Sequence, residues 1–117
     1  MRSSEQYDIP LSPAVFHILL SLAEGERHGY ALKRDIAQRT AGKLKLGPGM
    51  LYGTIHKMLE LGLIEESDER PDSHLDDERR RYYRITPLGR RAAKAEAARM
   101  RELVHLASAK FGAFKHA

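Results

Sequence analysis

Apolar residues recur at three- and four-residue steps in three places before position 62, a spacing that predicts three amphipathic helices. Proline at the first helical position and glycine after the last one mark helix limits of the usual kind. The predicted helices run from Pro13, after Ser12, to near Glu24, from His28 to about Ala41 with Gly42 as the stop, and from Pro48 to Leu61 with Gly62 as the stop. Their buried stripes are expected to be Leu11, Val15, Ile18, Leu19 and Leu22; Tyr30, Leu32, Ile36 and Ala37; and Leu51, Ile55, Met58 and Leu59.

Beyond these helices the pattern changes to short runs rich in β-branched and aromatic residues, which predicts two strands at 63–66 and 81–86. The segment between them, 67–80, is strongly charged and contains Pro71. We therefore expect a β-hairpin with a long, polar tip.

A last helix is predicted from Pro87, after the capping residue Thr86, and nothing in the sequence breaks it before Gly112. Its apolar residues follow the heptad spacing of a helix that pairs with another helix. Such a helix would be about 39 Å long, more than a three-helix body covers. We expect it to pair with a second copy of the chain; alternatively, it folds back on its own core. The residues expected at the homodimer interface are Ala93, Ala97, Met100, Leu103, Val104, Ala107, Phe111 and Phe114.

The order of these elements is that of a winged helix-turn-helix followed by a long C-terminal helix. The fold class is therefore predicted to be mainly α with a small β-hairpin (α+β). We divide the chain into an N-terminal tail at 1–10, a winged helix-turn-helix DNA-binding domain at 11–86 and a C-terminal dimerisation helix at 87–117.

Charge is distributed unevenly along the chain, which carries a formal net charge of +4. Eight of the 16 acidic residues lie between Glu65 and Glu78, together with one arginine, so the rest of the chain has 19 basic and eight acidic residues. A body this basic attracts polyanions, and double-stranded DNA is the partner that its pattern favours.

The third helix is the one that a winged helix normally places in the major groove. Its outward face is short of acid, its glycines permit close backbone approach, and its N-terminus favours phosphate. Basic residues precede it and line the returning strand of the hairpin. The predicted DNA-binding residues are Lys43, Lys45, Gly49, Met50, Tyr52, Gly53, His56, Lys57, Arg79, Arg80, Arg81 and Arg84.

Other classes of function are excluded by what the sequence lacks. The chain has no cysteine, no H-E-x-x-H motif and no glycine-rich loop after a strand, so we expect neither an enzyme nor a cofactor. Residues 1–10 have no apolar run typical of a secretory signal. The most apolar stretch, 14–23, is half of the roughly 20 residues that span a membrane, so we predict a cytoplasmic protein without a membrane partner.

Four sequence blocks, His28-Gly29-Tyr30-Ala31-Leu32, 46–52, 59–64 and 80–89, resemble the PadR-like transcriptional regulators in order and spacing. The resemblance runs from about Leu11 to Ala107, and the single C-terminal helix is similar to the short subfamily. It implies a bacterial homodimeric repressor that binds a palindromic promoter site and is released by a small aromatic or hydrophobic effector. Met50 replaces the usual Thr or Ser, Gly53 replaces a common Pro or Arg, and the absence of Trp leaves the effector-binding residues unassigned.

Several side chains have two interpretations. We expect Tyr30 and Tyr83 in core or hairpin packing, whereas Tyr52 either packs or contacts DNA. His28 is expected to begin the second helix; the alternative is a pH switch. Four residues could line an apolar space at the dimer interface or serve as ordinary core, namely Phe16, Met100, Phe111 and Phe114.

The one cluster that a metal ion could use is His74, Asp76, Asp77 and Glu78, and no metal site is predicted there because no second histidine supports it.

The alternative function is a winged-helix protein-interaction module that docks a partner on its acidic hairpin. Excess DNA would not displace a protein partner bound there, so competition separates the two functions. RNA binding is less favoured because exposed aromatic platforms are not evident in the sequence.

Overall fold

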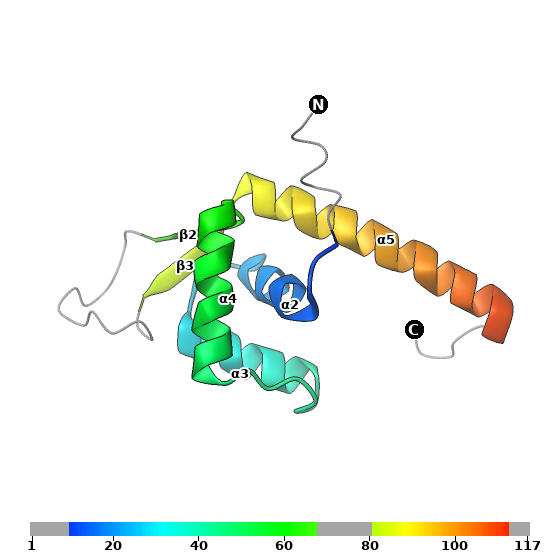
Figure 1. Ribbon diagram of the computed structural model, residues 1–117, viewed down its shortest axis with the longest axis horizontal. Helices are drawn as coiled ribbons and strands as arrows, with labels where there is room; N and C mark the ends of the chain where they lie inside the picture. Colours follow the sequence, from blue (N-terminus) through cyan, green and yellow to red (C-terminus); the bar gives the residue numbers. More distant parts are fainter. Residues whose placement is uncertain (1–9, 68–80, 113–117) are drawn as a thin grey trace.

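The predicted helices are present in the computed structural model, which describes residues 10–67 and 81–112. In chain order the elements are α2 (Pro13–Leu22), β1 (Arg27–His28), α3 (Gly29–Arg39), α4 (Pro48–Leu61), β2 (Ile64–Glu66), β3 (Tyr82–Ile85) and α5 (Pro87–Phe111). α5 crosses one end of the molecule, α3 lies at the opposite end, and α2 lies between them, with α4 connecting the two ends (Figure 1). The mainly α fold with a small sheet is confirmed.

Local chemistry defines the ends of the helices. The Ser12 hydroxyl oxygen accepts the N–H of Val15 at 3.2 Å, and the Thr86 hydroxyl oxygen accepts the N–H of Gly89 at 3.0 Å. Each oxygen satisfies a first-turn donor that has no partner within its helix. At the end of α4, Gly62 adopts φ 78°, the left-handed conformation that glycine enters without a Cβ penalty.

α3 ends two residues earlier than the sequence pattern indicates, at Arg39 rather than near Ala41. Ala41 and Gly42 have φ values of 53° and 79°, which no right-handed helix accommodates. The Thr40 hydroxyl donates to the carbonyl of Ile36 at 2.9 Å and accepts the N–H of Leu44 at 3.0 Å. The turn is thus fixed by a side chain as well as by the glycine.

The sheet contains a strand that the sequence analysis did not predict. β1, only two residues long, pairs antiparallel with β3, which also pairs with β2, so the strand order is β1-β3-β2. Tyr83 lies opposite Arg27 on one side and Glu66 on the other. A two-residue strand has no detectable period, and only the tertiary fold brings it to β3. It fixes the start of α3 to the hairpin.

The core lies where α2, α3 and α4 meet the sheet, and it consists of the stripes that the sequence pattern indicates. Ile18, Leu32 and Ile55 are fully buried, and Tyr83 is 2% exposed, as expected. Core or hairpin packing is predicted for Tyr30 too, and that prediction is wrong because Tyr30 is 50% exposed. Around the axis of α3, Tyr30 is rotated by about 100° from the buried Gly29 and faces away from Leu32 and Ile36.

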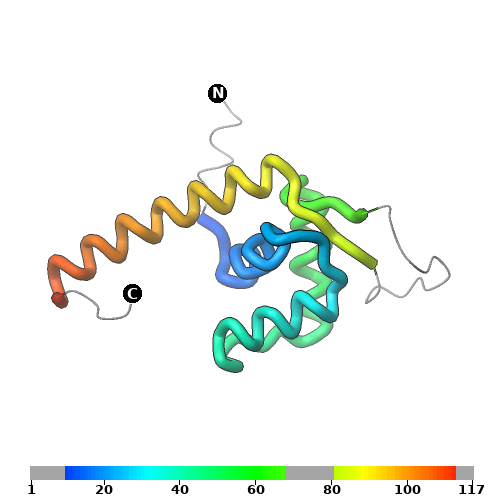
Figure 2. The backbone as a smooth tube through the Cα atoms, turned by 180° about the vertical axis from the view of Figure 1, so that it is seen from behind, coloured from blue at the N-terminus to red at the C-terminus, as the bar shows by residue number. Residues whose placement is uncertain are grey.

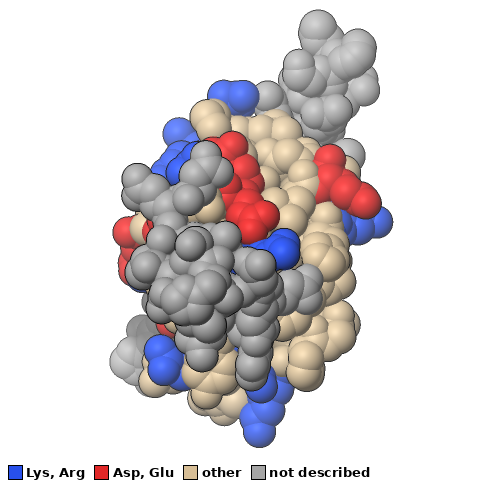
Figure 3. All heavy atoms as spheres, turned by 90° about the vertical axis from the view of Figure 1, so that its left-hand side faces the viewer, with Lys and Arg blue, Asp and Glu red and all other residues tan. Residues whose placement is uncertain are grey.

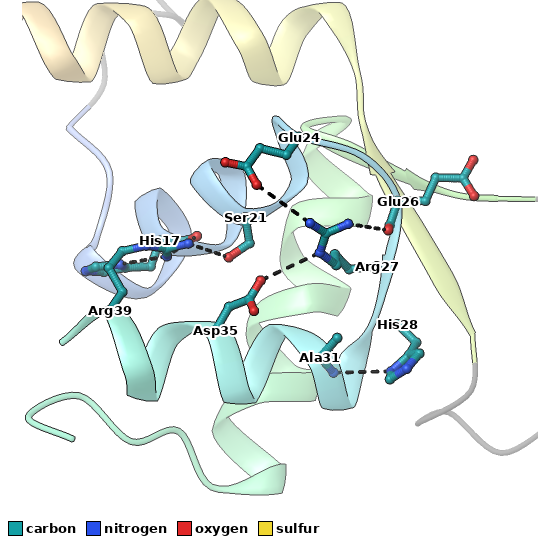
Figure 4. Close-up of polar contacts among 9 residues, drawn as sticks. All are labelled: His17, Ser21, Glu24, Glu26, Arg27, His28, Ala31, Asp35 and Arg39. Carbon is teal, nitrogen blue, oxygen red and sulfur yellow. Dashed lines mark hydrogen bonds and ion pairs between the residues drawn. The ribbon is translucent and has the colours of Figure 1, made fainter. Parts of the chain in front are cut away.

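Two arginines connect the helices around this core (Figure 4). Arg39, at the end of α3, donates to Ser21 Oγ at 2.9 Å and to His17 Nδ1 at 3.2 Å on α2. Arg27 lies 3.7 Å from a carboxylate oxygen of Glu24 and 3.7 Å from one of Asp35. Partial burial, followed by the positive charge of Arg39, lowers the pKa of His17. This favours the neutral ring that accepts the arginine proton.

Candidate nucleic-acid interface

The outward face of α4 has the geometry that the sequence predicts. Leu51, Ile55 and Met58 are buried, whereas the opposite face is exposed. A methyl group added at Gly49 or Gly53 would meet nothing within 4 Å, so the backbone here is open to close approach. The residues of this exposed face are Gly49, Met50, Gly53, His56, Lys57 and Glu60.

Tyr52 packs between α3 and α4. It is half-buried against the core, and a Cβ built on Gly29 would lie 2.6 Å from its hydroxyl oxygen and 2.8 Å from Cε1. A larger residue at position 29 would force this ring to shift. Of the two interpretations of Tyr52, the structure supports packing, and the contact sets how closely α4 approaches the start of α3.

The turn before α4 exposes its two lysines and buries its leucines. Leu46 is 2% exposed and Leu44 packs against the core, whereas Lys43 and Lys45 are exposed. The leucines fix the position of the turn, and the two exposed lysines belong to the segment directly before α4. The Gly47 cap contributes no side-chain hydrogen bond to the first turn of α4. This arrangement favours an anionic ligand.

The arginines of the hairpin are engaged with acidic side chains. Arg84 Nε donates to Glu65 Oε2 at 2.8 Å, and its NH1 lies 3.6 Å from Glu26 Oε2. Arg81 lies 3.6 Å from Glu66. Arg84 therefore connects β3 to β2 and to the residue that precedes β1. Sequence reasoning missed these pairs because they join residues far apart in the chain; Arg79 and Arg80 lie outside the described residues.

Figure 3 shows the hairpin side of the molecule. Acidic side chains gather mainly in the upper half of this view, whereas lysines and arginines occur in both halves, including the lower end, where α3 and the start of α4 lie in Figure 1. The exposed cations of α3 and of the turn before α4 are Lys33, Arg34, Arg39, Lys43 and Lys45. Exposed cations therefore lie on α3 and in the turn directly before α4.

α5 changes from packed to unpartnered along its length. Gly89, Ala92 and Glu96 are buried, and Ala93 packs against the core, so the unpartnered stripe begins later than expected. The second half extends beyond the head, which is the body that α2, α3, α4 and the sheet form (Figure 2). Its large apolar side chains are exposed, by 39% at Met100, 64% at Leu103, 48% at Val104, 51% at Leu106 and 80% at Phe111. Of the remaining predicted interface residues, Ala97 is exposed, Ala107 is half-buried and Phe114 lies outside the described residues.

Glu96 fastens α5 to the head, a role that the sequence gave no reason to expect. Its Oε1 accepts the N–H of Leu11 at 3.0 Å and an Arg99 N–H at 2.7 Å. The hydrogen bond from Arg99, followed by that from Leu11, lowers the pKa of Glu96, although burial acts in the opposite direction. In the sequence, the only signal of this role is that a charged residue interrupts the alanine-rich stripe of the last helix.

We expect Glu96→Gln to destabilise the fold at neutral pH by about 1 kcal/mol, because a neutral amide accepts these hydrogen bonds less strongly. Since the pKa is lower in the folded state, the stabilisation is full above the ordinary value of 4.5 and is lost as the pH falls through the folded value. Urea unfolding at neutral and acidic pH measures this. The difference between wild type and variant should shrink in acid, and exposed Glu102→Gln is the control. A constant difference would contradict the prediction.

Residues 10–67 and 81–112, the part that the structure describes, contain no group of three metal-ligating side chains, and the cluster at 74–78 lies outside them. None of their helices is long and apolar enough to cross a membrane.

An exposed helix at the second position of a helix-turn-helix, a three-stranded sheet behind it and a projecting C-terminal helix define a winged-helix protein. Residues 18–95 match the model of the transcriptional regulator PadR-like family. The chain belongs to this family, which consists of transcriptional regulators and not of enzymes.

Individual relatives agree with this assignment. The chain is 34% identical over 87 residues to the transcriptional regulator Rv3488 of Mycobacterium tuberculosis, covering 74% of this chain and 75% of the relative. It is also 34% identical over 86 residues, 74% of its length, to an uncharacterised 37.1 kDa protein of a Streptomyces fradiae transposon, of which it spans 22%. A transcriptional regulator from Clostridium thermocellum has a similar structure, with a TM-score of 0.65, 28% identity and coverage of 84% of this chain and 88% of that one.

Proposed function

We propose that this chain is a cytoplasmic, sequence-specific DNA-binding repressor that acts as a homodimer on a palindromic promoter site. The observation that carries the proposal is the face of α4, where Gly49 and Gly53 leave the backbone open and His56 and Lys57 are exposed. An exposed helix with small and hydrogen-bonding residues suits the major groove, where donors and acceptors identify base pairs. Lys43 and Lys45 supply cations beside it for the phosphates.

The second half of α5 supports the homodimer. α5 has 25 residues and is therefore about 37 Å long, and only its first half packs against the head. Large exposed apolar side chains at heptad spacing are covered most simply by the same stripe of a second copy. Two copies related by a two-fold axis would place their α4 helices about 10 base pairs apart, which requires a pseudo-palindromic site.

Release by a small aromatic or hydrophobic effector is the regulatory part of the proposal. The exposed large apolar side chains of α5 are mainly aliphatic, so a space that they enclose between two copies would favour apolar ligands. An effector acts only if it binds the DNA-free dimer more tightly than the DNA-bound one. Adding candidate compounds to a preformed complex with DNA tests this directly.

The first experiment is fluorescence anisotropy with DNA from upstream of the gene for this protein and a scrambled duplex of equal length. The salt concentration is fixed at about 0.15 M, because non-specific binding dominates at low salt. We expect a preference of about a thousandfold for the upstream DNA. Equal weak binding to both duplexes, and to a library of random duplexes, would favour the protein-interaction module.

We expect Lys57→Ala to weaken binding to the preferred duplex about tenfold, because hydrogen bonds to charged groups are the stronger ones. If Lys57 neutralises a phosphate, the slope of log affinity against log salt concentration also becomes less steep. The expected change is about one unit for each protomer whose Lys57 contacts a phosphate. Titrations at several salt concentrations measure both. Lys94→Ala on α5 removes the same charge away from α4 and serves as the control. Equal effects of the two variants would show that Lys57 does not contact the DNA.

A further inference from the structure

Tyr30 and Arg34 form an exposed pair on the outer face of α3. Tyr30 is 50% exposed, and the guanidinium carbon of Arg34, one turn further along, lies 5.5 Å from the centre of the Tyr30 ring. Among the described residues Arg34 forms no ion pair with a carboxylate, in contrast to Arg27 and Arg84. An aromatic ring that could be buried and a cation that could be paired are instead both presented to solvent.

The pair lies on α3, the helix that contacts α4 through the Tyr52 ring. Gly29, the residue before Tyr30, is in contact with the Tyr52 ring of α4. Tyr30 and Arg34 occupy the side of α3 away from the buried Leu32 and Ile36. They therefore lie on the solvent side of α3, the helix that contacts α4 through Gly29 and Tyr52.

The chemistry of the pair suits a phosphodiester. A guanidinium offers planar, paired N–H donors that match phosphate oxygens, and a tyrosine hydroxyl can donate one more hydrogen bond. The ring beneath Arg34 restricts the guanidinium, so less side-chain freedom is lost when a phosphate binds. Ion-paired arginines such as Arg84 would first have to give up their carboxylates.

We propose that Tyr30 and Arg34 form a second contact with the DNA backbone, on phosphates flanking the groove that α4 occupies. This inference rests on the proposed function. The pair contributes affinity and positions α4 in the groove, but it does not read sequence, because phosphates are the same at every base pair.

The test compares Arg34→Gln, Tyr30→Phe and Tyr30→Ala with wild type by anisotropy, on a duplex selected by the wild-type protein from a random library and on a scrambled duplex. Lys94→Gln is the matched control, because it removes one positive charge from an exposed position on α5. Thermal unfolding followed by circular dichroism shows whether each variant remains folded, which is expected since both side chains are exposed.

We expect Arg34→Gln to weaken binding to both duplexes by about the same factor, roughly tenfold, and to reduce the steepness of the salt dependence. Tyr30→Ala should weaken both as well, and Tyr30→Phe should weaken them less. Combined with Arg34→Gln, Tyr30→Ala should add little, because the two side chains act as a unit. If Tyr30→Ala unfolds, Tyr30→Phe combined with Arg34→Gln provides the comparison.

An Arg34→Gln effect no larger than that of Lys94→Gln would overturn the inference, and so would a loss confined to the selected duplex. Failure of the proposed function is distinguishable. In that case wild type itself would not prefer any duplex, whereas failure of this inference alone leaves wild-type binding and the Lys57→Ala effect intact.

Discussion

Gly89→Ala is expected to destabilise the fold by about 1–3 kcal/mol, the usual cost of forcing extra volume into a packed site. The added methyl group would overlap the carbonyl oxygen of Leu63 and would lie 2.9 Å from Cγ1 of Ile85. The carbonyl cannot move aside freely, because it accepts the N–H of Thr86 at 3.1 Å and lies 3.0 Å from the Thr86 hydroxyl oxygen, which donates to the Gly62 carbonyl at 2.6 Å. This junction joins the sheet to the start of α5.

Urea unfolding at one protein concentration measures the effect, and Gly53→Ala is the matched control. Position 53 is also helical, but a methyl group there meets nothing within 4 Å. Alanine should therefore stabilise α4 by about 0.5–1 kcal/mol, because it restricts the unfolded chain and favours the helix. Equal effects at positions 53 and 89 would show that α5 does not approach Leu63 this closely.

Replacing Leu103 and Val104 together by glutamate is expected to convert the proposed homodimer into a monomer. Both side chains are exposed in a single chain, so the monomer should remain folded. In a dimer they would bring like charges into an apolar interface, which is unfavourable. Loss of the second half-site should lower the affinity for the selected duplex by about 10²–10⁴-fold, because the two heads no longer bind as one ligand.

Sedimentation equilibrium gives the oligomeric state of this variant, and anisotropy gives its affinity. Leu61→Glu is the control, since Leu61 is 56% exposed at the end of α4 and lies outside the predicted interface. It should leave the mass unchanged. A dimer that survives the double substitution would show that α5 does not form the interface.

The helices could be predicted closely because their signals are local. The cap at Ser12, the cap at Thr86 and the left-handed Gly62 act within four residues of the backbone groups that they affect. α3 was predicted two residues too long because Ala41 gives no sign of a positive φ in its own side chain. β1 was missed because a two-residue strand exists only through its partner.

The candidate site was less predictable, because it depends on partners distant in sequence. The exposed face of α4 follows from helical period alone. The partners of Arg84, by contrast, come from β2 and from the segment before β1, and no spacing indicates that its charge is already paired. The exposure of Tyr30 likewise depends on Gly29 facing Tyr52 on another helix.

The sequence by itself determined the positions of the helices, the face of each that is buried, the hairpin strands and the family. These properties depend on neighbours within a few turns and on the period of 3.6 or 2 residues. Only the tertiary structure decided which arginines are paired, which tyrosine is buried, how Glu96 connects α5 to the head and where α5 leaves it. Burial and ion pairing are set by contacts between distant segments, so their partners are known only once the chain is folded.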